Sequence, residues 1–387
     1  MIGNNLPFGS SEKTNRLFEL DWLRVLAIFT VFIYHSLRFF TIEDWHVKNP
    51  STYGSLEILA NYLEIWMMPL IFMISGASVF LATRKNKPIR KFIWDKILRL
   101  LVPLLVGIFT QSILQVFLER ISHGEFSGSF WAFLPHYFEG LYGFGGNFAW
   151  MGLHLWYLEV LFFFSIIFLP VVLITRRPKG RQILTKLGDF FAVKGAIYIL
   201  LSAAVFLWKL FGPDSLLGKD IFGWPLACEF SFFIVGYLFV SNQNLMQSIR
   251  RLRWISFSGA ILTSVLFLAT QDHADLVVWF VILTLLGFGG KYLYYSSSFL
   301  TYANPAVLPF YILHQPILLC IGFFVVGWHI SEPLKYLAIA LPSFLLTLGL
   351  YEFLVRRSNM LRFLFGMKLA YRIPQPAAIA PSVDSTY

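Results

Sequence analysis

The sequence has few charged residues. Asp, Glu, Lys and Arg make up 13% of its 387 residues, against about a quarter in soluble globular domains. A soluble fold needs polar side chains to cover its surface, and hydrophobic residues here reach 57%. The same apolar content excludes a disordered chain, because it is ample to build a core. With these two classes excluded, the low charge content indicates a protein that crosses a membrane several times.

Cysteines and familiar catalytic motifs are also scarce. The two cysteines, Cys228 and Cys320, lie in apolar runs, so we expect neither a disulfide framework nor a cysteine metal site. We find no phosphate-binding loop, zinc-ligand spacing, dinucleotide fingerprint or GxSxG motif. The polar start of the chain does not resemble a signal peptide. We expect no metal and no permanently bound cofactor.

What the sequence has instead is long apolar runs of about twenty residues, the length that a helix needs to span a bilayer. The runs are continuously apolar rather than alternating, which indicates helices and excludes barrel strands. The predicted fold class is therefore an all-α, polytopic integral membrane protein with about ten transmembrane helices. The runs lie near 20–41, 57–82, 98–118, 150–174, 191–211, 222–241, 254–270, 275–295, 306–328 and 334–355.

The positive charge is concentrated in every second connection between these runs. The net charge is +10, and the richest basic connections are 83–97 and 175–194. Because basic loops face the cytoplasm, this alternation predicts that both termini are cytoplasmic. The charge excess therefore requires no nucleic-acid partner. We divide the chain into a cytoplasmic segment 1–19, a transmembrane region 20–355 and a basic cytoplasmic tail 356–387 that is disordered at its end.

The longest outer connection, 119–149, is rich in aromatic residues and glycine and poor in charge. This composition is typical of an interfacial helix or a re-entrant cap over an outward-facing site. It is equally typical of an aromatic belt at the membrane surface. Both interpretations stay open from the sequence.

Ionisable side chains inside a bilayer cost several kcal/mol and therefore point to function. Arg24 and His35 are eleven positions apart, close to three helical turns, so they project to the same side of one helix about 16 Å apart. Arg24 is expected near the cytoplasmic face and His35 beyond the midplane. The alternatives are that Arg24 snorkels to the headgroups and that His35 makes a hydrogen bond between helices.

Further polar residues are expected at the depth of His35. Glu64, His154, Glu159 and Glu229 fall in the outer parts of three other spans, which favours one water-accessible cavity that opens outward. Each could instead make a structural hydrogen bond. His314 precedes Pro316, where proline frees a backbone carbonyl, so this position is either a polar site or a simple kink.

The cytoplasmic side offers cations for phosphate binding. Lys96 and Arg99 are three residues apart at the start of a span, so they share a helix face and could grip phosphates. The alternative is an ordinary basic stretch that binds anionic lipid.

Four sequence blocks resemble the acyltransferase family 3 membrane enzymes. LDWLRVLAIFTVFIYHSLRFF (20–40) is similar to the family's first helix, and Arg24 and His35 match its Arg-x10-His signature. KILRLLVP (96–103) is similar to its Arg-x-x-Arg segment, with Lys96 in the first position, which keeps the charge but loses the bidentate fork. HLWYLEVLF (154–162) and YILHQP (311–316) complete the set. The DWLR start and EDWHVKN (43–49) most resemble the glucan biosynthesis protein C subgroup.

The resemblance implies an O-acyltransferase of a bacterial inner membrane. It would move an acyl group, succinyl or acetyl, from cytoplasmic acyl-CoA as co-substrate to a hydroxyl of an extracytoplasmic glycan or glucan. Membrane lipids are its other expected partners. His35 is the expected general base, with direct attack by His35 to form an acyl-enzyme as a variant. We place Glu159 first as its orienting partner, with Glu64 and Glu229 as alternatives. The expected substrate-binding residues are Arg24, Lys96, Arg99, His154, Glu64, Glu229 and His314.

A different class remains open. A secondary transporter or a flippase for a small polar or glycan-linked solute would also need buried carboxylates and histidines, to relay protons or bind the solute. The two halves of the sequence show no obvious likeness, which disfavours an inverted-repeat transporter. An acyltransferase would release free CoA, and a transporter would not.

Overall fold

The structure is a computed structural model that describes residues 16–83, 88–199 and 226–370. Within these ranges the chain is helical, and its one β-bridge, between Leu141 and Phe148, is isolated. The longer helices are α1 (Phe18–Leu37), α2 (Gly54–Thr83), α5 (Gln111–Ser122), α7 (Trp156–Ile167), α9 (Pro178–Ala192), α11 (Leu226–Ser241), α13 (Arg253–Thr270), α14 (Ala274–Tyr292), α15 (Ser298–Val325) and α16 (Glu332–Leu350).

Shorter helices link or extend these elements. They are α3 (Ile89–Lys96), α4 (Val102–Ile108), α6 (Phe130–His136), α8 (Leu169–Arg176), α12 (Gln243–Arg251) and α17 (Asn359–Leu364), the 3-10 turns η2 (Leu153–Leu155) and η3 (Ala196–Tyr198), and the π-helical turns η1 (Ile97–Leu101) and η5 (Tyr351–Val355).

The helices confirm the predicted all-α membrane fold. In the described part of the chain, seven helices are long and apolar enough to cross a membrane, and the count rises to nine if each of two bent pairs is one span. The pairs are Leu153–Ile167 with Leu169–Arg176, bent by 43°, and Leu226–Ser241 with Gln243–Arg251, bent by 102°. The predicted span 191–211 lies largely outside the described residues. The total of ten and the cytoplasmic termini stay predictions.

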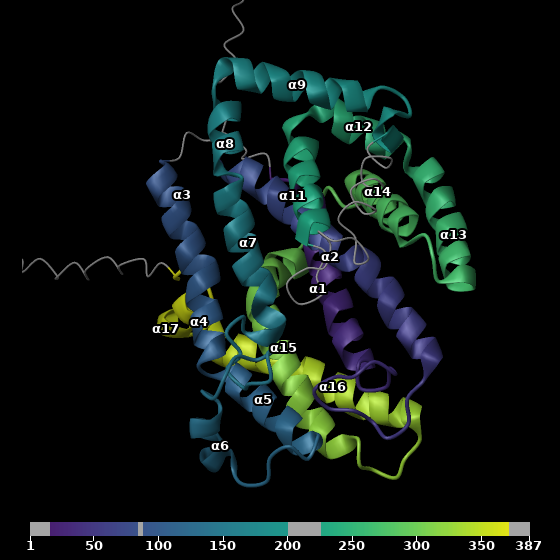
Figure 1. Ribbon diagram of the computed structural model, residues 1–387. Helices are drawn as coiled ribbons and strands as arrows, with labels where there is room; N and C mark the ends of the chain where they lie inside the picture. The colour runs from purple at the N-terminus through teal and green to yellow at the C-terminus, as the bar shows by residue number, and fades with distance from the viewer. Residues whose placement is uncertain (1–15, 84–87, 200–225, 371–387) are drawn as a thin grey trace, which may run out of the picture.

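Helix α1 lies inside the bundle and packs against α2, α14, α15 and α16. Figure 1 shows α9 lying across one end of the molecule beside α12, and α6 at the other end. At the α9 and α12 end, Glu19 near the start of α1 pairs with Arg250 at 2.8 Å. His35 therefore lies at the end of α1 that is remote from the basic helices α9 and α12.

Close packing of α2 on α11 depends on two glycines. A Cβ at Gly76 would lie 1.8 Å from the carbonyl oxygen of Phe233, and a Cβ at Gly236 would lie 1.8 Å from that of Met73. Small residues at these positions let two membrane helices approach to backbone contact. The contact sets the position of α2, which contributes Glu64 to the site.

Candidate active site

A cavity of about 520 Å³ opens at the end of α1. Its walls come from α1, α2, α15, the segment 38–49 and the segment 142–156. The second of these wall segments includes the end of the outer connection 119–149, so this part of the connection covers the cavity, as the cap interpretation expects. His35, Glu64 and His154 line the cavity, so three of the residues that were expected at one depth share it.

The ring of His35 is held by a second histidine. His35 Nδ1 lies 2.9 Å from His314 Nε2, and His314 Nδ1 lies 2.7 Å from the carbonyl oxygen of Tyr311. A carbonyl can only accept, so a neutral His314 carries its proton on Nδ1 and accepts at Nε2. His35 then donates from Nδ1, which leaves His35 Nε2 as an unprotonated nitrogen on a ring that lines the cavity. This is the form that a general base needs.

This contact corrects the expected pairing of His35 with a glutamate. Among the described hydrogen bonds, those of His35 include none to Glu159, Glu64 or Glu229. Glu159 Oε2 and Glu229 Oε2 are buried without a hydrogen-bond partner in the described chain, and neither side chain lines the cavity. Glu64 lines it and accepts a hydrogen bond from the Tyr34 hydroxyl at 3.0 Å.

His154 is buried and holds a backbone carbonyl of α15. Its Nε2 lies 3.2 Å from the carbonyl oxygen of Ile312. Ile312 is four residues before Pro316, and proline has no N–H to satisfy that carbonyl. His154 therefore carries its proton on Nε2, while its Nδ1 is buried without a partner in the described structure. Pro316 and the polar site at His314 are thus linked through His154, whose ring centroid is 5.5 Å from that of His314.

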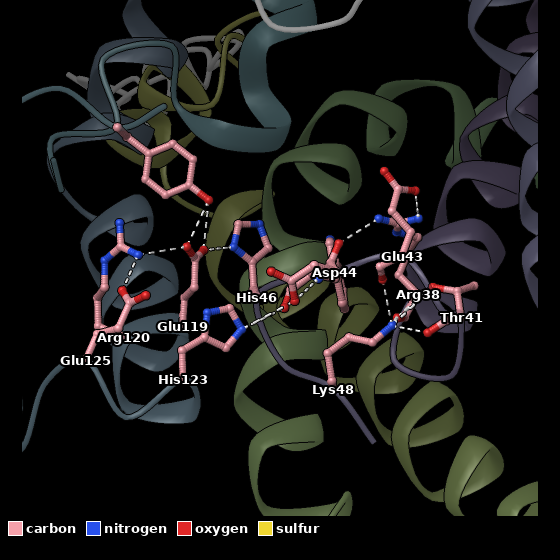
Figure 2. Close-up of polar contacts among 12 residues, drawn as sticks. Arg38, Thr41, Glu43, Asp44, His46, Lys48, Glu119, Arg120, His123 and Glu125 are labelled. Atoms are coloured by element: carbon pink, nitrogen blue, oxygen red, sulfur yellow. Dashed lines mark hydrogen bonds and ion pairs between the residues drawn. The ribbon is translucent and has the colours of Figure 1, made fainter. Parts of the chain in front are cut away.

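The segment 38–49 is held together by charged groups (Figure 2). Arg38, which is buried, pairs with Glu43 at 2.5 Å and with Glu57 at 3.8 Å. Lys48 donates to the carbonyl oxygens of Arg38 and Glu43, both at 2.9 Å, and to that of Thr41. Burial, and then the positive charge of Arg38, lower the pKa of Lys48 to about 8. The fold of this segment places Trp45 and His46 on the cavity wall.

A third histidine on the same wall, His46, pairs with a carboxylate behind it. His46 Nδ1 contacts Glu119 Oε2, and both side chains are nearly buried. The other contacts of Glu119 are the Tyr142 hydroxyl, which donates at 2.9 Å, and Arg120 at 3.5 Å. Figure 2 shows Glu119 between His46 and Arg120. Partial burial, and then the negative charge of Glu119, raise the pKa of Tyr142, so its hydroxyl stays a donor.

The sequence did not predict the roles of Arg38, His46 and Glu119 in the site. A signal was present for His46, because it belongs to EDWHVKN, which was used only for the family resemblance. Glu119 was assigned to an outer connection, whereas α5 continues to Ser122. Its side chain therefore projects from a helix into the cap.

Near the start of α1, Arg24 is held inside the bundle. Its guanidinium donates to three neighbours: Asp21 at 3.1 Å, Asn304 at 3.2 Å and Ser78 at 2.9 Å. With 30% of its side chain exposed, it keeps some access to solvent. Lys96, at the end of α3, places its Nζ 5.6 Å from the ring centroid of a phenylalanine one turn earlier.

Arg99 approaches the same end of α15 as Arg24. It lies exposed on η1, and its carbonyl oxygen is 2.6 Å from where a Cβ of Gly366 would stand. The side chain of Leu308 is 3.0 Å from that same point. Leu308 and Asn304 are one turn apart on α15, so the backbone of Arg99 and the side chain of Arg24 both lie along the first half of that helix. This supports a shared basic region, and its phosphate-binding role stays a prediction.

The arrangement is that of an integral membrane protein with an unprotonated histidine nitrogen in a polar cavity at one end and basic residues at the other. In the described ranges, no group of three or more His, Cys, Asp or Glu side chains is arranged to hold a metal ion. The chemistry that these residues can perform themselves is acid–base catalysis of transfer to a hydroxyl.

Comparison with known proteins identifies the family. The acyltransferase domain family matches residues 17–352, nearly the whole chain. The chain therefore belongs to acyltransferase family 3 and is a membrane acyltransferase. It is 22% identical over 395 aligned positions to proteins named glucans biosynthesis protein C from Salmonella heidelberg (strain SL476), Salmonella schwarzengrund (strain CVM19633) and Salmonella typhi. The alignments cover 96% of this chain and 100% of each relative. No solved structure matches significantly.

Proposed function

We propose that this acyltransferase moves an acyl group, succinyl or acetyl, from cytoplasmic acyl-CoA to a hydroxyl of an extracytoplasmic glycan, with a glucan as the first candidate. We place the protein in a bacterial inner membrane. The observation that supports the proposal most directly is the His35–His314 contact, which leaves His35 Nε2 unprotonated on the cavity wall. The names of the 22% identical relatives motivate the choice of a glucan.

The cavity suits a polyhydroxylated acceptor. Trp45, Trp150 and Trp156 provide flat apolar surfaces, and Glu43 and Glu64 provide carboxylates that accept hydrogen bonds from hydroxyls. The ring of Trp45 is stacked on that of His35, with centroids 6.2 Å apart and planes inclined by 9°. An acceptor on this wall would have a hydroxyl next to the imidazole.

The reaction follows from these positions. His35 Nε2 takes the proton of the acceptor hydroxyl while the oxygen attacks the thioester carbonyl carbon. The carbon–sulfur bond then breaks, which gives the ester and CoA. His314 fixes the orientation and tautomer of His35 and shares the positive charge that develops. Arg24, Lys96 and Arg99 would hold the phosphates of the donor at the cytoplasmic end, and the slim pantetheine arm would pass between the helices.

The test uses purified protein in detergent with succinyl-CoA or acetyl-CoA and a soluble β-glucan oligosaccharide. We expect acceptor-dependent release of free CoA, detected with a thiol reagent, and a matching mass increase of the oligosaccharide. His35→Ala should remain folded and lose the transfer by about 10²- to 10⁴-fold, the usual contribution of a general base. Full activity of this variant would refute the assigned base. Solute accumulation in proteoliposomes without CoA release would instead indicate a transporter.

A further inference from the structure

Of the three histidines on the cavity wall, His35 and His46 both lie next to the ring of Trp45. The ring centroid of Trp45 is 6.2 Å from that of His35 and 5.5 Å from that of His46. Both histidines have Nδ1 occupied, by His314 and by Glu119 respectively. For neither ring does the described chain provide a hydrogen bond at Nε2, and both rings line the cavity. Each ring can therefore present Nε2 to a substrate.

The partners of the two rings differ in charge. His314 is pinned by the Tyr311 carbonyl as a neutral acceptor, so the group at Nδ1 of His35 carries no negative charge. Glu119 is a carboxylate, and a carboxylate at Nδ1 stabilises the imidazolium form of its histidine. Paired titratable groups in opposite surroundings are how active sites separate an acid from a base. By this argument His35 is the base and His46 the acid.

The carboxylate of Glu119 is itself held in place. Its oxygens accept from the Tyr142 hydroxyl at 2.9 and 3.1 Å, and Arg120 lies 3.5 Å away. Arg120 is anchored in turn by Glu125 at 2.5 Å and by Asn147 at 2.8 Å. These contacts tie α5 to the loop that covers the cavity (Figure 2). An ordinary surface ion pair would not need such support.

We propose that His46, positioned by Glu119, is the general acid that gives its Nε2 proton to the leaving sulfur of the acyl donor. The proposal rests on the acyl transfer proposed above. His35 removes a proton from the acceptor hydroxyl, the new carbon–oxygen bond forms, the carbon–sulfur bond breaks, and the sulfur receives the proton of His46 as CoA leaves as a thiol. His35 then loses its proton to water in the cavity and His46 regains one, so the cycle is balanced.

A proton donor is needed because of where the bond breaks. The cavity is lined by aromatic rings and methionines as well as by polar groups, and an unpaired anion is costly in such surroundings. A thiolate that formed there would meet the carboxylates Glu43 and Glu64. Protonation of the sulfur as it departs removes this charge.

The test compares His46→Gln, Glu119→Gln and the double variant with wild type, with the CoA release assay described above. Glutamine at 119 keeps the shape and the acceptor for Tyr142 but removes the negative charge. We expect kcat to fall about 100-fold in each single variant, with KM for the acyl-CoA nearly unchanged. The double variant should be no slower than His46→Gln, because the two residues act as one unit. Glu119→Asp should recover part of kcat.

The matched control is His123→Gln. His123 lies one turn beyond Glu119 on the same end of α5, and its Nε2 contacts the Trp45 carbonyl oxygen at 3.2 Å, so it also holds the segment that includes His46. It is absent from the cavity wall. We expect this variant to keep nearly full kcat. If His123→Gln loses as much kcat as His46→Gln, then the position of the segment 38–49, rather than proton donation by His46, determines kcat. That result would overturn the proposal.

A second readout addresses the sulfur directly. A thioester of the same acyl group with thiophenol has a more acidic leaving thiol than acyl-CoA, so its departure needs no proton donor. We expect the defect of His46→Gln to shrink from about 100-fold to below about 10-fold with this donor. An equal defect with both donors would overturn the proposal, as would full kcat of His46→Gln with acyl-CoA. If wild type releases no CoA at all, the proposed function itself fails, and the role of His46 with it.

Discussion

At the scale of single residues, Pro316 has no N–H to give to the carbonyl of Ile312, and the ring of His154 supplies the missing donor at 3.2 Å. A proline inside a membrane helix is tolerated when a neighbouring helix satisfies the freed carbonyl in this way. The pairing also brings the start of α7 against α15 at the level of His314. His154 and His314, whose ring centroids are 5.5 Å apart, thus meet in the turn of α15 that precedes the proline.

This pairing predicts strong coupling between two substitutions. His154→Leu should destabilise the protein by about 1–3 kcal/mol, because it leaves the Ile312 carbonyl buried without a donor. Pro316→Ala restores an N–H at position 316, so the helix can satisfy that carbonyl itself. The double variant should therefore be more stable than the sum of the single effects predicts, measured from thermal unfolding in detergent. Additive effects would show that His154 does not serve this carbonyl.

Lys48 predicts a pH dependence of stability. Its pKa falls from 10.5 to about 8 in the fold, through burial and then Arg38. Between these values the unfolded chain binds more protons than the folded one, so stability rises with pH there. Below the pKa of Lys48 in the folded state, both the folded and the unfolded chain carry the proton. The free-energy cost of burying the charged ammonium is then fully present.

Wild type should therefore gain stability relative to Lys48→Met as the pH is raised from about 7.5 to about 9.5, compared by thermal unfolding. Lys179→Met, at an exposed position on α9, controls for general effects of pH on the protein. If the difference between wild type and Lys48→Met stays constant over this range, the ammonium of Lys48 is not the titrating group.

At the scale of elements, the apolar runs predicted the helices well. Nine of the ten runs coincide with described helices or bent helix pairs, since length and hydropathy alone decide whether a segment can span a bilayer. The bends after Ile167 and Ser241 were not predicted. The bend after Ser241 sets α12 at 102° to α11. An apolar run has no feature that marks such a bend.

The partners within the site were harder to predict. Counting residues from the end of a span gives the depth of a side chain in the membrane, and this placed His35, Glu64 and His154 together correctly. It does not give the direction in which a helix turns that side chain. Glu159 and Glu229 were chosen by depth but do not line the cavity. The partner of His35 is His314, 279 positions away, and only helix packing determines that contact.

The contact of α2 with α11 predicts a selective effect of alanine. In Gly236→Ala the new Cβ would lie 1.8 Å from the Met73 carbonyl oxygen, so the helices must separate. We expect a loss of about 1–3 kcal/mol in stability, seen as a lower unfolding temperature.

Gly349→Ala is the matched control on α16, where a Cβ would have no atom within 4 Å. That variant should be neutral or more stable by up to about 1 kcal/mol, because alanine favours helix more than glycine does. If both variants behave alike, α2 and α11 do not rely on backbone contact.

At the scale of the whole molecule, the two ends of the bundle differ in chemistry. Helices α9 and α12, which are rich in basic residues, lie at one end of the molecule, and α6 lies at the other end (Figure 1). The cavity with its histidines and carboxylates lies at the end of α1 that is remote from α12. Arg24 and His35 join these ends on the single helix α1, about 16 Å apart along its axis. A donor with phosphates at one end and a thioester at the tip of a long arm matches this division, because each part meets the side chains that suit it.

The division predicts that transfer depends on sidedness. In sealed proteoliposomes with the α9 end facing inward, we expect acylated oligosaccharide only when acyl-CoA is enclosed and the acceptor is outside. Acyl-CoA outside should give no product, because its charged phosphates cannot cross the bilayer and the cavity end has no phosphate site in the proposal. Permeabilising the vesicles should restore transfer in every arrangement, which controls for inactive protein. Transfer with both substrates outside sealed vesicles would mean that the donor enters through the cavity, and the basic end would then need another role.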